Sequence, residues 1–301
     1  MKLFLLTALV ALALSGPAIV RDPSSPILTQ EDIDFINQNQ DSWTASLDWV
    51  GSMTYEEAQK YASTEIKPRE FPEYNWGAIL DNFQAPASFD SRNQWPSCIH
   101  PILNQEQCGS CWAFGATEAL SDRLCIGSKG SINVVLSPQY LVDCDHLNLG
   151  CNGGNPDLAW SFMKSKGVPA YSCVSYTGAN GKCPSTCDDG SEFQFYKAAS
   201  VNTYSGPSSI QAAILAGGPV ETGFSVYQDF MSYSGGIYKH TTGDYLGGHA
   251  VKIIGWGNQN GTNYWICANS WGTSWGLQGF FWIAFGQCGI DSQAVAGSPS
   301  V

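Results

Sequence analysis

The chain has 301 residues, of which 44% are hydrophobic and 13% aromatic, and its formal net charge is −12. This composition can bury a sizeable core, which excludes a wholly disordered protein. An acidic surface repels phosphate groups, so nucleic acid and anionic membrane surfaces are excluded as expected partners.

The first fifteen residues have the pattern of a secretory signal peptide. Lys2 precedes an apolar stretch from Leu3 to Leu14, and Ala13-Leu14-Ser15 fits a small-x-small cleavage site. A membrane-spanning helix needs about 20 apolar residues, more than this stretch holds. We therefore predict a signal peptide over 1–15, no membrane span, and a route through the secretory pathway to a lysosome-like vesicle or to secretion.

Residues 16–84 are acidic and contain no cysteine. Helical segments are predicted around Gln30–Asn37 and Thr54–Tyr61, because Glu56 and Glu57 suit the first turn of the second one. Tryptophans would anchor this leader on a larger body, since a disordered acidic tail would leave their apolar surface in water. They are Trp43, Trp49 and Trp76.

A helical half is expected over residues 85–200. Between Ser110 and Leu124, alanine and leucine recur at three- and four-residue spacings on one face. Ser137-Pro138 and Asn155-Pro156 each place a capping side chain before a proline that suits the first helical position. We predict a helix over Ser110–Leu124 and further helices near Gln139–Val142 and Asp157–Lys166.

A β-rich half is expected over residues 201–301. One last helix, capped by Ser208 or Ser209, would end at Gly217-Gly218-Pro219. Strands are predicted where short aromatic and β-branched runs follow, bounded by glycine and asparagine. These runs are Ala250–Gly255, Tyr264–Ala268 and Gly279–Phe285. The two halves make an α+β fold with a cleft between them.

Cys111 is the strongest candidate for a catalytic nucleophile. It lies in the first turn of its predicted helix, where the helix dipole and backbone donors favour a thiolate. Eleven cysteines behind a secretory signal predict a disulfide framework, and the odd count leaves at least one free thiol. A thiolate also needs a base and a group that orients the base, and His249 and Asn269 follow downstream in suitable segments.

The segment Gln105-Glu106-Gln107-Cys108-Gly109-Ser110-Cys111-Trp112, with Gly150-Cys151-Asn152-Gly153-Gly154 and Asn269-Ser270-Trp271, resembles papain-family cysteine peptidases. The likeness is strongest to their cathepsin B group and runs from about residue 85 to the C-terminus. It implies a papain-like two-lobed fold with an N-terminal inhibitory propeptide over 16–84, processed near Gln84 and Ala85. The implied activity is a cysteine endopeptidase, made as a zymogen, that needs no metal or organic cofactor.

The same resemblance assigns roles to individual residues. Cys111 would be the nucleophile, His249 the general base, Asn269 its orienting residue and Gln105 an oxyanion donor. Trp271 would shield the hydrogen bond between His249 and Asn269 from water. Gly153 and Gly154 would pair with extended substrate, and the pocket for the second residue before the scissile bond (S2) would include Pro156, Ala250 and Gln293.

Four disulfides are implied by the resemblance: Cys98–Cys125, Cys108–Cys151, Cys144–Cys183 and Cys173–Cys187. Cys267 and Cys288 remain, and their apolar surroundings favour buried inert thiols over a fifth bridge. The implied partners are peptide and protein substrates, the chain's own propeptide and cystatin-type inhibitors, with a monomer as the expected state. His100, His146 and His240 are expected to have structural roles, and use of the sequon at Asn260 stays open.

Two departures from the cathepsin B pattern are informative. Gln293 stands where that group has glutamate, so we predict an apolar S2 preference. The segment 173–183 holds no histidine, whereas the group carries a pair in an occluding loop there, so we predict endopeptidase action.

Two other functions stay open on the sequence alone. Cys108-Gly109-Ser110-Cys111 has the C-x-x-C spacing of thiol-disulfide oxidoreductases, although the strand–helix–strand order of thioredoxin-like folds is missing. A catalytically silent binding homologue is the other alternative. Counting reactive thiols separates the first alternative from a protease.

Overall fold

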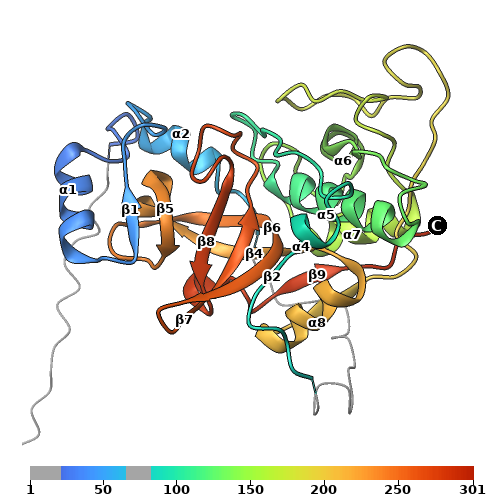
Figure 1. The fold of residues 1–301 in the computed structure, drawn as a ribbon. Helices are drawn as coiled ribbons and strands as arrows, with labels where there is room; N and C mark the ends of the chain where they lie inside the picture. Colours follow the sequence, from blue (N-terminus) through green and yellow to red (C-terminus); the bar gives the residue numbers. More distant parts are fainter. Residues whose placement is uncertain (1–21, 66–82) are drawn as a thin grey trace, which may run out of the picture.

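The structure is a computed structural model that describes residues 22–65 and 83–301 (Figure 1). The predicted signal peptide and Trp76 lie outside these residues. None of the helices in the described ranges combines the length and apolar character that crossing a membrane would require.

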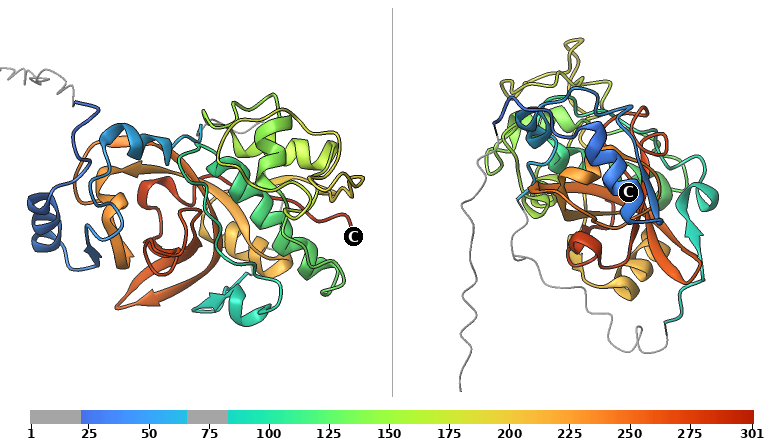
Figure 2. Two further views of the ribbon diagram at one scale, coloured as in Figure 1. Left: turned by 90° about the horizontal axis from the view of Figure 1, so that it is seen from above. Right: turned by 90° about the vertical axis from the view of Figure 1, so that its left-hand side faces the viewer.

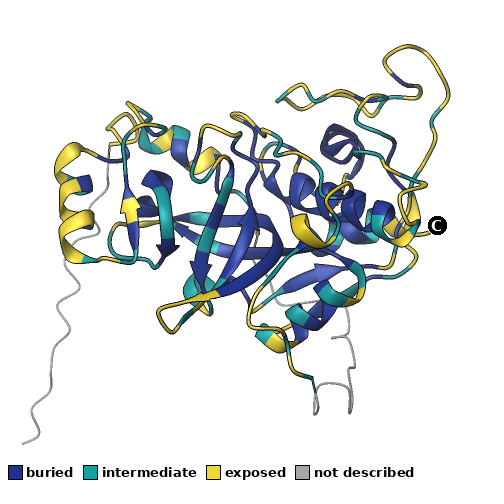
Figure 3. Ribbon diagram, viewed as in Figure 1, coloured by how far each residue is buried: buried dark blue, intermediate teal, exposed yellow. Residues whose placement is uncertain are grey.

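One lobe is built from helices that surround α5 (Cys111–Gly127). Helices α6 (Pro138–Cys144) and α7 (Pro156–Ser165) pack against α5 (Figures 1 and 2). Helix α5 is buried along nearly its whole length, because it also packs against strands of the other lobe (Figure 3). The central helix therefore forms the boundary between the two lobes.

The second lobe is a twisted sheet in the order β5-β8-β7-β6-β4-β9-β3, with β2 on β6, and the leader strand β1 (Trp43–Ala45) pairs with β5 at its edge. Strand β6 is central: it pairs antiparallel with β4 on one side and with β7 on the other. The strands of this lobe are β3 (Asn202–Tyr204), β4 (Val220–Tyr227), β5 (Tyr233–Tyr238), β6 (Tyr245–Gln259), β7 (Thr262–Ala268), β8 (Phe280–Ala284) and β9 (Ala294–Ala296). Short elements complete it: β2 (Phe89–Asp90), α4 (Ser91–Gln94) and the 3-10 turns η1 (Gln228–Ser232) and η2 (Gln287–Gly289).

Helix α8 (Pro207–Gly217) corrects one predicted cap. Its N-cap is Gly206, with φ at 77°, and Pro207 takes the first helical position. Ser208 and Ser209 therefore lie inside the first turn. Proline fixes the helical φ before either serine is reached, so the chain enters the helix earlier than the serines suggest.

Strand β6 corrects a second expectation. The sequence predicts a strand from Ala250, just after His249, but β6 begins at Tyr245. Gly247, Gly248 and His249 all pair with β4. His249 is consequently held inside a ladder of backbone hydrogen bonds, which fixes its position more firmly than a strand end would.

The leader packs beside the sheet lobe through its own elements, α1 (Gln30–Asn39), β1 (Trp43–Ala45) and α2 (Tyr55–Lys60) (Figure 1). Helices α1 and α2 each begin with a complete capping box, at Thr29 and at Thr54. Strand β1 adds to the sheet edge at β5, and the Trp43 indole donates to the carbonyl of Lys239 over 3.0 Å.

Four disulfides stabilise the body, and they are the pairs that the resemblance implies: Cys98–Cys125, Cys108–Cys151, Cys144–Cys183 and Cys173–Cys187. Cys111, Cys267 and Cys288 are free. Cys267 is buried as expected, but Cys288 is only partly buried, because it lies in the tight turn η2 at the rim of the sheet.

Candidate active site

Cys111 is the first residue of α5, and its side chain is fully buried beneath the leader. Its N-cap is Ser110, whose side chain makes no capping hydrogen bond. As the first residue of α5, Cys111 lies at the positive end of the helix dipole. The local structure therefore favours negative charge on the sulfur.

His249 reaches the site from the opposite lobe on β6, and Asn269 fixes its tautomer. The imidazole Nε2 lies 2.7 Å from the Asn269 side-chain oxygen, which also accepts the backbone N–H of Ser270. An oxygen can only accept, so Nε2 carries the proton in the neutral ring. Nδ1 is then the basic nitrogen, and it is buried without a hydrogen bond of standard geometry to any described residue.

The pKa of the Cys111 thiol lies at about 6, well below its usual value. Burial raises the pKa, but the positive charge of His249 and its side-chain interaction with the sulfur outweigh burial. Weaker lowering comes from Thr64 and from the backbone N–H of Ala250. The Cys111 sulfur is therefore a thiolate above about pH 6, beside the His249 side chain.

Trp271 covers the pair formed by His249 and Asn269. It is only 1% exposed, and its ring lies 4.8 Å from the His249 imidazole, centroid to centroid. Water is kept from the hydrogen bond between His249 and Asn269, which strengthens that bond in the lower local dielectric.

Gln105 lies at the junction of the lobes with its side chain completely buried. Its side-chain oxygen accepts from the Ser270 hydroxyl at 2.8 Å, and its side-chain nitrogen donates to the Cys108 carbonyl at 3.0 Å. An amide nitrogen has two protons, so one N–H is left beyond the bond to Cys108. Gln105 is thus fixed beside the nucleophile segment, and one of its side-chain N–H groups could donate to an oxyanion.

The leader crosses this site as an extended strand, a contact that sequence reasoning did not predict. The Thr64 hydroxyl lies 2.9 Å from the Cys111 sulfur, and the Thr64 backbone N–H donates to the carbonyl of Gly248. The next amide, of Glu65, donates to the carbonyl of Gly154. The leader backbone is therefore paired with both walls of the cleft.

Glycines on both walls make this close approach possible. A Cβ at Gly153, where φ is +112°, would collide with the Ser63 carbonyl, and one at Gly247 would collide with the Ala62 carbonyl. Any larger residue at either place would push an extended chain out of the cleft. The predicted role of Gly153 and Gly154 in pairing with extended peptide fits this geometry.

The predicted S2 residues come from α7, from β6 and from the residue before β9. Pro156 opens α7 two residues after Gly154, and Ala250 follows His249 on β6 with 1% exposure. The Gln293 carbonyl accepts from the Thr222 hydroxyl over 3.2 Å, on the strand that pairs with β6 around Ala250. Ala250 on β6 and Gln293, directly before β9, therefore lie on opposite sides of β4 in the sheet.

The remaining histidines lie away from the catalytic residues. His240 stacks on Tyr227 at 3.8 Å and lies 3.1 Å from the buried carboxylate of Asp229, while His146 is exposed. His100 lies 2.7 Å from the carboxylate of Asp122. None of the three reaches the nucleophile in the described structure.

A buried charge cluster links the two lobes behind the nucleophile, and sequence reasoning did not predict it. Lys252 of β6 lies 2.7 Å from the Asp122 carboxylate and 3.7 Å from the Glu118 carboxylate, both on α5. Burial lowers the pKa of Lys252, but the charges of Asp122 and Glu118 outweigh it and raise that pKa. Burial raises the pKa of Glu118 to about 7, since the attraction of Lys252 offsets the loss of hydration only in part.

This cluster predicts that the protein loses stability as the pH rises. The folded pKa of Glu118 lies above its unfolded value, so its contribution is complete below about pH 4.5 and lost as the pH rises through about 7. The loss is on the order of 3 kcal/mol, at about 1.4 kcal/mol per pH unit. Glu118→Gln should therefore flatten the decline in the free energy of unfolding between pH 5 and pH 7.5.

Urea unfolding at both pH values measures the effect, in a Cys111→Ala background that prevents self-digestion. Glu192→Gln, which neutralises an exposed carboxylate, is the matched control and should leave the decline unchanged. An equal decline in the Glu118→Gln protein would contradict the assignment.

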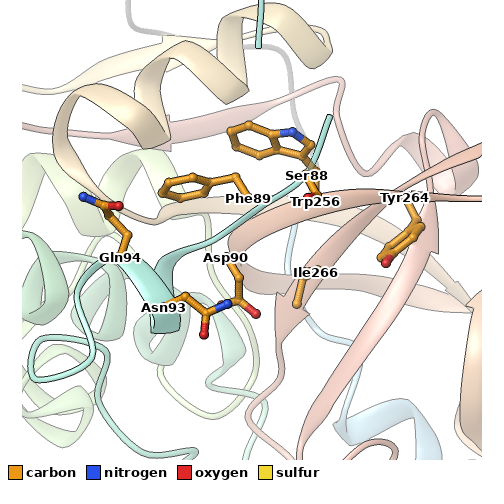
Figure 4. Close-up of a pocket in the computed structure, with 8 residues that line it drawn as sticks. All are labelled: Ser88, Phe89, Asp90, Asn93, Gln94, Trp256, Tyr264 and Ile266. Carbon is orange, nitrogen blue, oxygen red and sulfur yellow. The ribbon is translucent and has the colours of Figure 1, made fainter. Parts of the chain in front are cut away.

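A surface pocket of about 340 Å³ lies apart from this site (Figure 4). It is bounded by β2, α4 and the strands β6 and β7. None of its lining residues is a predicted catalytic or substrate-binding residue, so it is not the peptide cleft. Its lining consists of Ser88, Phe89, Asp90, Asn93, Gln94, Trp256, Tyr264 and Ile266.

Within the described residues, no group of three or more His, Cys, Asp or Glu side chains could hold a metal ion.

Comparison with known proteins agrees with this geometry. Residues 85–298 match the family model described as "Papain family cysteine protease". A "Gut-specific cysteine proteinase" of Caenorhabditis elegans is 42% identical over the full length of both chains, and "Cathepsin B-like CP3" of Giardia intestinalis is 37% identical over 99% of both.

Solved structures of proenzymes are similar as well. "ProCathepsin B S9 from Trypanosoma congolense" superimposes with a TM-score of 0.87 at 31% identity, covering 92% of this chain and all of that one. A procathepsin L2 from the midgut of Tenebrio molitor gives 0.75 at 32% identity, covering 90% of this chain and 88% of that one. The family match spans more than half of the chain and contains the thiol, imidazole and amide described above. The chain therefore belongs to the papain family of cysteine proteases and is a cathepsin B-like member of it.

Proposed function

We propose that this protease is made as a zymogen and acts after maturation as an endopeptidase with an apolar S2 preference. The observation that carries the proposal is the pairing of Thr64 with both walls of the cleft, 2.9 Å from the Cys111 sulfur. A cleft that accepts one extended backbone in this way is suited to bind the backbone of a substrate.

The catalytic steps follow from the two charged groups and the amide. The Cys111 thiolate attacks the scissile carbonyl carbon, and negative charge moves to the carbonyl oxygen beside Gln105 and the Cys111 N–H. The His249 imidazolium gives its proton to the leaving amine as the C–N bond breaks. Water then gives a proton to His249 and attacks the thioester, which releases the acid and restores the thiolate.

The prosegment, residues 16–84, is proposed to inhibit the enzyme until it is removed near Gln84 and Ala85. Trp49 of the leader stacks on Trp271 with ring centroids 5.4 Å apart, and Tyr61 packs edge-on against the same ring. Together with Thr64, these side chains occupy the catalytic centre and the aromatic surface beside it. Solved relatives in their pro-forms support this assignment.

Endopeptidase action is proposed from the segment 173–183, which lacks histidine. Two disulfides, Cys144–Cys183 and Cys173–Cys187, tie this short segment to the helical lobe. The segment therefore lacks the histidine pair that captures a substrate's C-terminal carboxylate in the cathepsin B group, so we expect no selection for chain ends. The S2 preference is proposed from Gln293, which cannot provide the negative charge that would attract arginine.

Digestion of a denatured protein, with the fragments identified by mass spectrometry, tests both proposals. We expect internal cuts, with Phe, Leu or Val favoured over Arg by at least about tenfold in kcat/KM at the second residue before the cut. A Gln293→Glu variant is the matched control and should gain activity toward Arg. Release of C-terminal dipeptides only, or an Arg preference in the unchanged enzyme, would contradict the proposal.

The alternatives have less support. Cys108 forms a disulfide with Cys151 while Cys111 stays free, so the C-x-x-C pair does not form the redox couple of an oxidoreductase. A silent homologue is disfavoured because the thiol, imidazole and amide are all present and ordered. We further propose a route through the secretory pathway, cystatin-type inhibitors as partners, and a monomer, as the family resemblance implies.

A further inference from the structure

The backbone of Gln105 is held from both lobes, by different residues. Its N–H donates to the Ser270 carbonyl from the sheet lobe at 2.8 Å. Its carbonyl accepts the Tyr176 hydroxyl from the helical lobe at 2.7 Å. Tyr176 belongs to the short segment 173–183, so this segment contacts the residue that is proposed to stabilise the oxyanion.

The direction of each proton at Tyr176 is determined by its partners. The Gln105 carbonyl can only accept, so Tyr176 must give its single proton there. The Ser110 hydroxyl, 2.7 Å away, must then donate to the Tyr176 oxygen. Burial raises the pKa of Tyr176 above its usual range, so the phenol keeps this proton at any working pH.

This arrangement explains why Ser110 does not cap α5 with its side chain. The hydroxyl of a serine N-cap usually accepts an amide from the first turn, but here Ser110 turns to Tyr176. The same phenol therefore holds Gln105 and the residue before the nucleophile. These are the two sides of the pocket in which the oxyanion would form.

Two further contacts stiffen the same turn. Glu106 has φ at 55°, an unfavourable value for a residue with a side chain, and it directly follows the carbonyl that Tyr176 holds. The Tyr176 ring packs edge-on against Phe114 of α5 at 4.8 Å. Gly178 lies against the Glu106 side chain, where a Cβ would come within 2.6 Å of a carboxylate oxygen.

We propose that Tyr176 is a positioning residue that holds Gln105 and Ser110 at the spacing the oxyanion requires. The inference rests on the proposed oxyanion role of Gln105 and adds a function for the short segment 173–183. Without the phenol hydroxyl, the Gln105 carbonyl keeps only the longer bond from the Cys108 N–H at 3.4 Å, and the strained turn at Glu106 can relax. The amide would then bind the developing charge less well, whereas the thiolate, held by His249, would be unchanged.

The test is Tyr176→Phe, which keeps the ring and removes only the hydroxyl. In the matured enzyme we expect kcat for a peptide amide to fall about tenfold, with KM within about twofold. Alkylation of Cys111 by iodoacetamide needs the thiolate but no oxyanion pocket. The alkylation rate of Tyr176→Phe, and the decrease of that rate at acid pH, should therefore equal those of the unchanged enzyme. Tyr233→Phe is the control. The Tyr233 hydroxyl also donates to a backbone carbonyl, that of Gly236 at 2.6 Å, but it makes no contact with Gln105.

The outcomes separate this inference from the proposed function. If Gln105→Ala lowers kcat but Tyr176→Phe does not, positioning by Tyr176 is wrong while the oxyanion role stands. If Tyr176→Phe slows alkylation as much as hydrolysis, the phenol supports the nucleophile in general and the inference is also wrong. Full activity of Gln105→Ala would overturn the oxyanion role itself.

Discussion

Replacing Cys111 with alanine is expected to lower peptide hydrolysis by a factor on the order of 10⁴–10⁶. The free thiol at the start of α5 is the one whose pKa is lowered, to about 6, while burial raises the pKa of Cys267 well above its usual range. Without the sulfur, no side chain is left to attack the scissile carbonyl. The oxyanion then rarely forms, so Gln105 and His249 can contribute little to the rate.

The measurement is kcat/KM of the matured protein on a fluorogenic peptide, with secondary structure checked by circular dichroism. Cys267→Ala is the matched control, since it also removes a buried free thiol and should keep full activity. Because Cys111 takes part in no disulfide, the alanine variant should fold normally. Activity within tenfold of the unchanged enzyme would refute nucleophilic catalysis by this sulfur.

Gln105→Ala is expected to lower kcat by about 10²–10³ and to change KM little. The Gln105 amide has one N–H committed to the Cys108 carbonyl and one left for the oxyanion. Binding of the extended substrate depends instead on backbone pairing with the glycines of the cleft. The loss should therefore appear in the chemical step and not in ground-state binding.

Steady-state kinetics on the same peptide measure this split between kcat and KM. Gln107→Ala is the control: it removes a glutamine two residues away, whose side chain contacts Tyr61 of the leader over 3.1 Å. Once the leader is removed, that contact is gone, so the control should keep its turnover. A Gln105→Ala enzyme with undiminished kcat would show that another donor stabilises the oxyanion.

Local signals in the sequence were sufficient for much of the helical lobe. Ser137-Pro138 and Asn155-Pro156 begin α6 and α7 as predicted, because a cap followed by proline determines the helix start within a few residues. Helix α8 also begins with a cap followed by proline, Gly206-Pro207. The prediction placed the cap at Ser208 or Ser209 instead. The extent of β6 was underestimated, since its first residues are glycines whose strand conformation depends on pairing with β4.

The chemistry of the site was predictable from motifs, but its surroundings were not. Thr64 and Cys111 are 47 residues apart, and Glu118 meets Lys252 across the two lobes. Such contacts depend on how the lobes pack, and no periodicity in the chain encodes them. Tyr176 likewise looks like an ordinary loop aromatic until the fold brings it to Gln105.

Mass spectrometry of a matured sample, treated with an irreversible epoxide thiol inhibitor, tests the central claim most directly. It reports both the labelled sulfur and the new N-terminus. We predict one inhibitor per chain, attached to Cys111, on a protein that begins near Ala85 and has lost activity in proportion to labelling. A label on Cys267 or Cys288, or an unlabelled Cys111 in an inactivated enzyme, would contradict it.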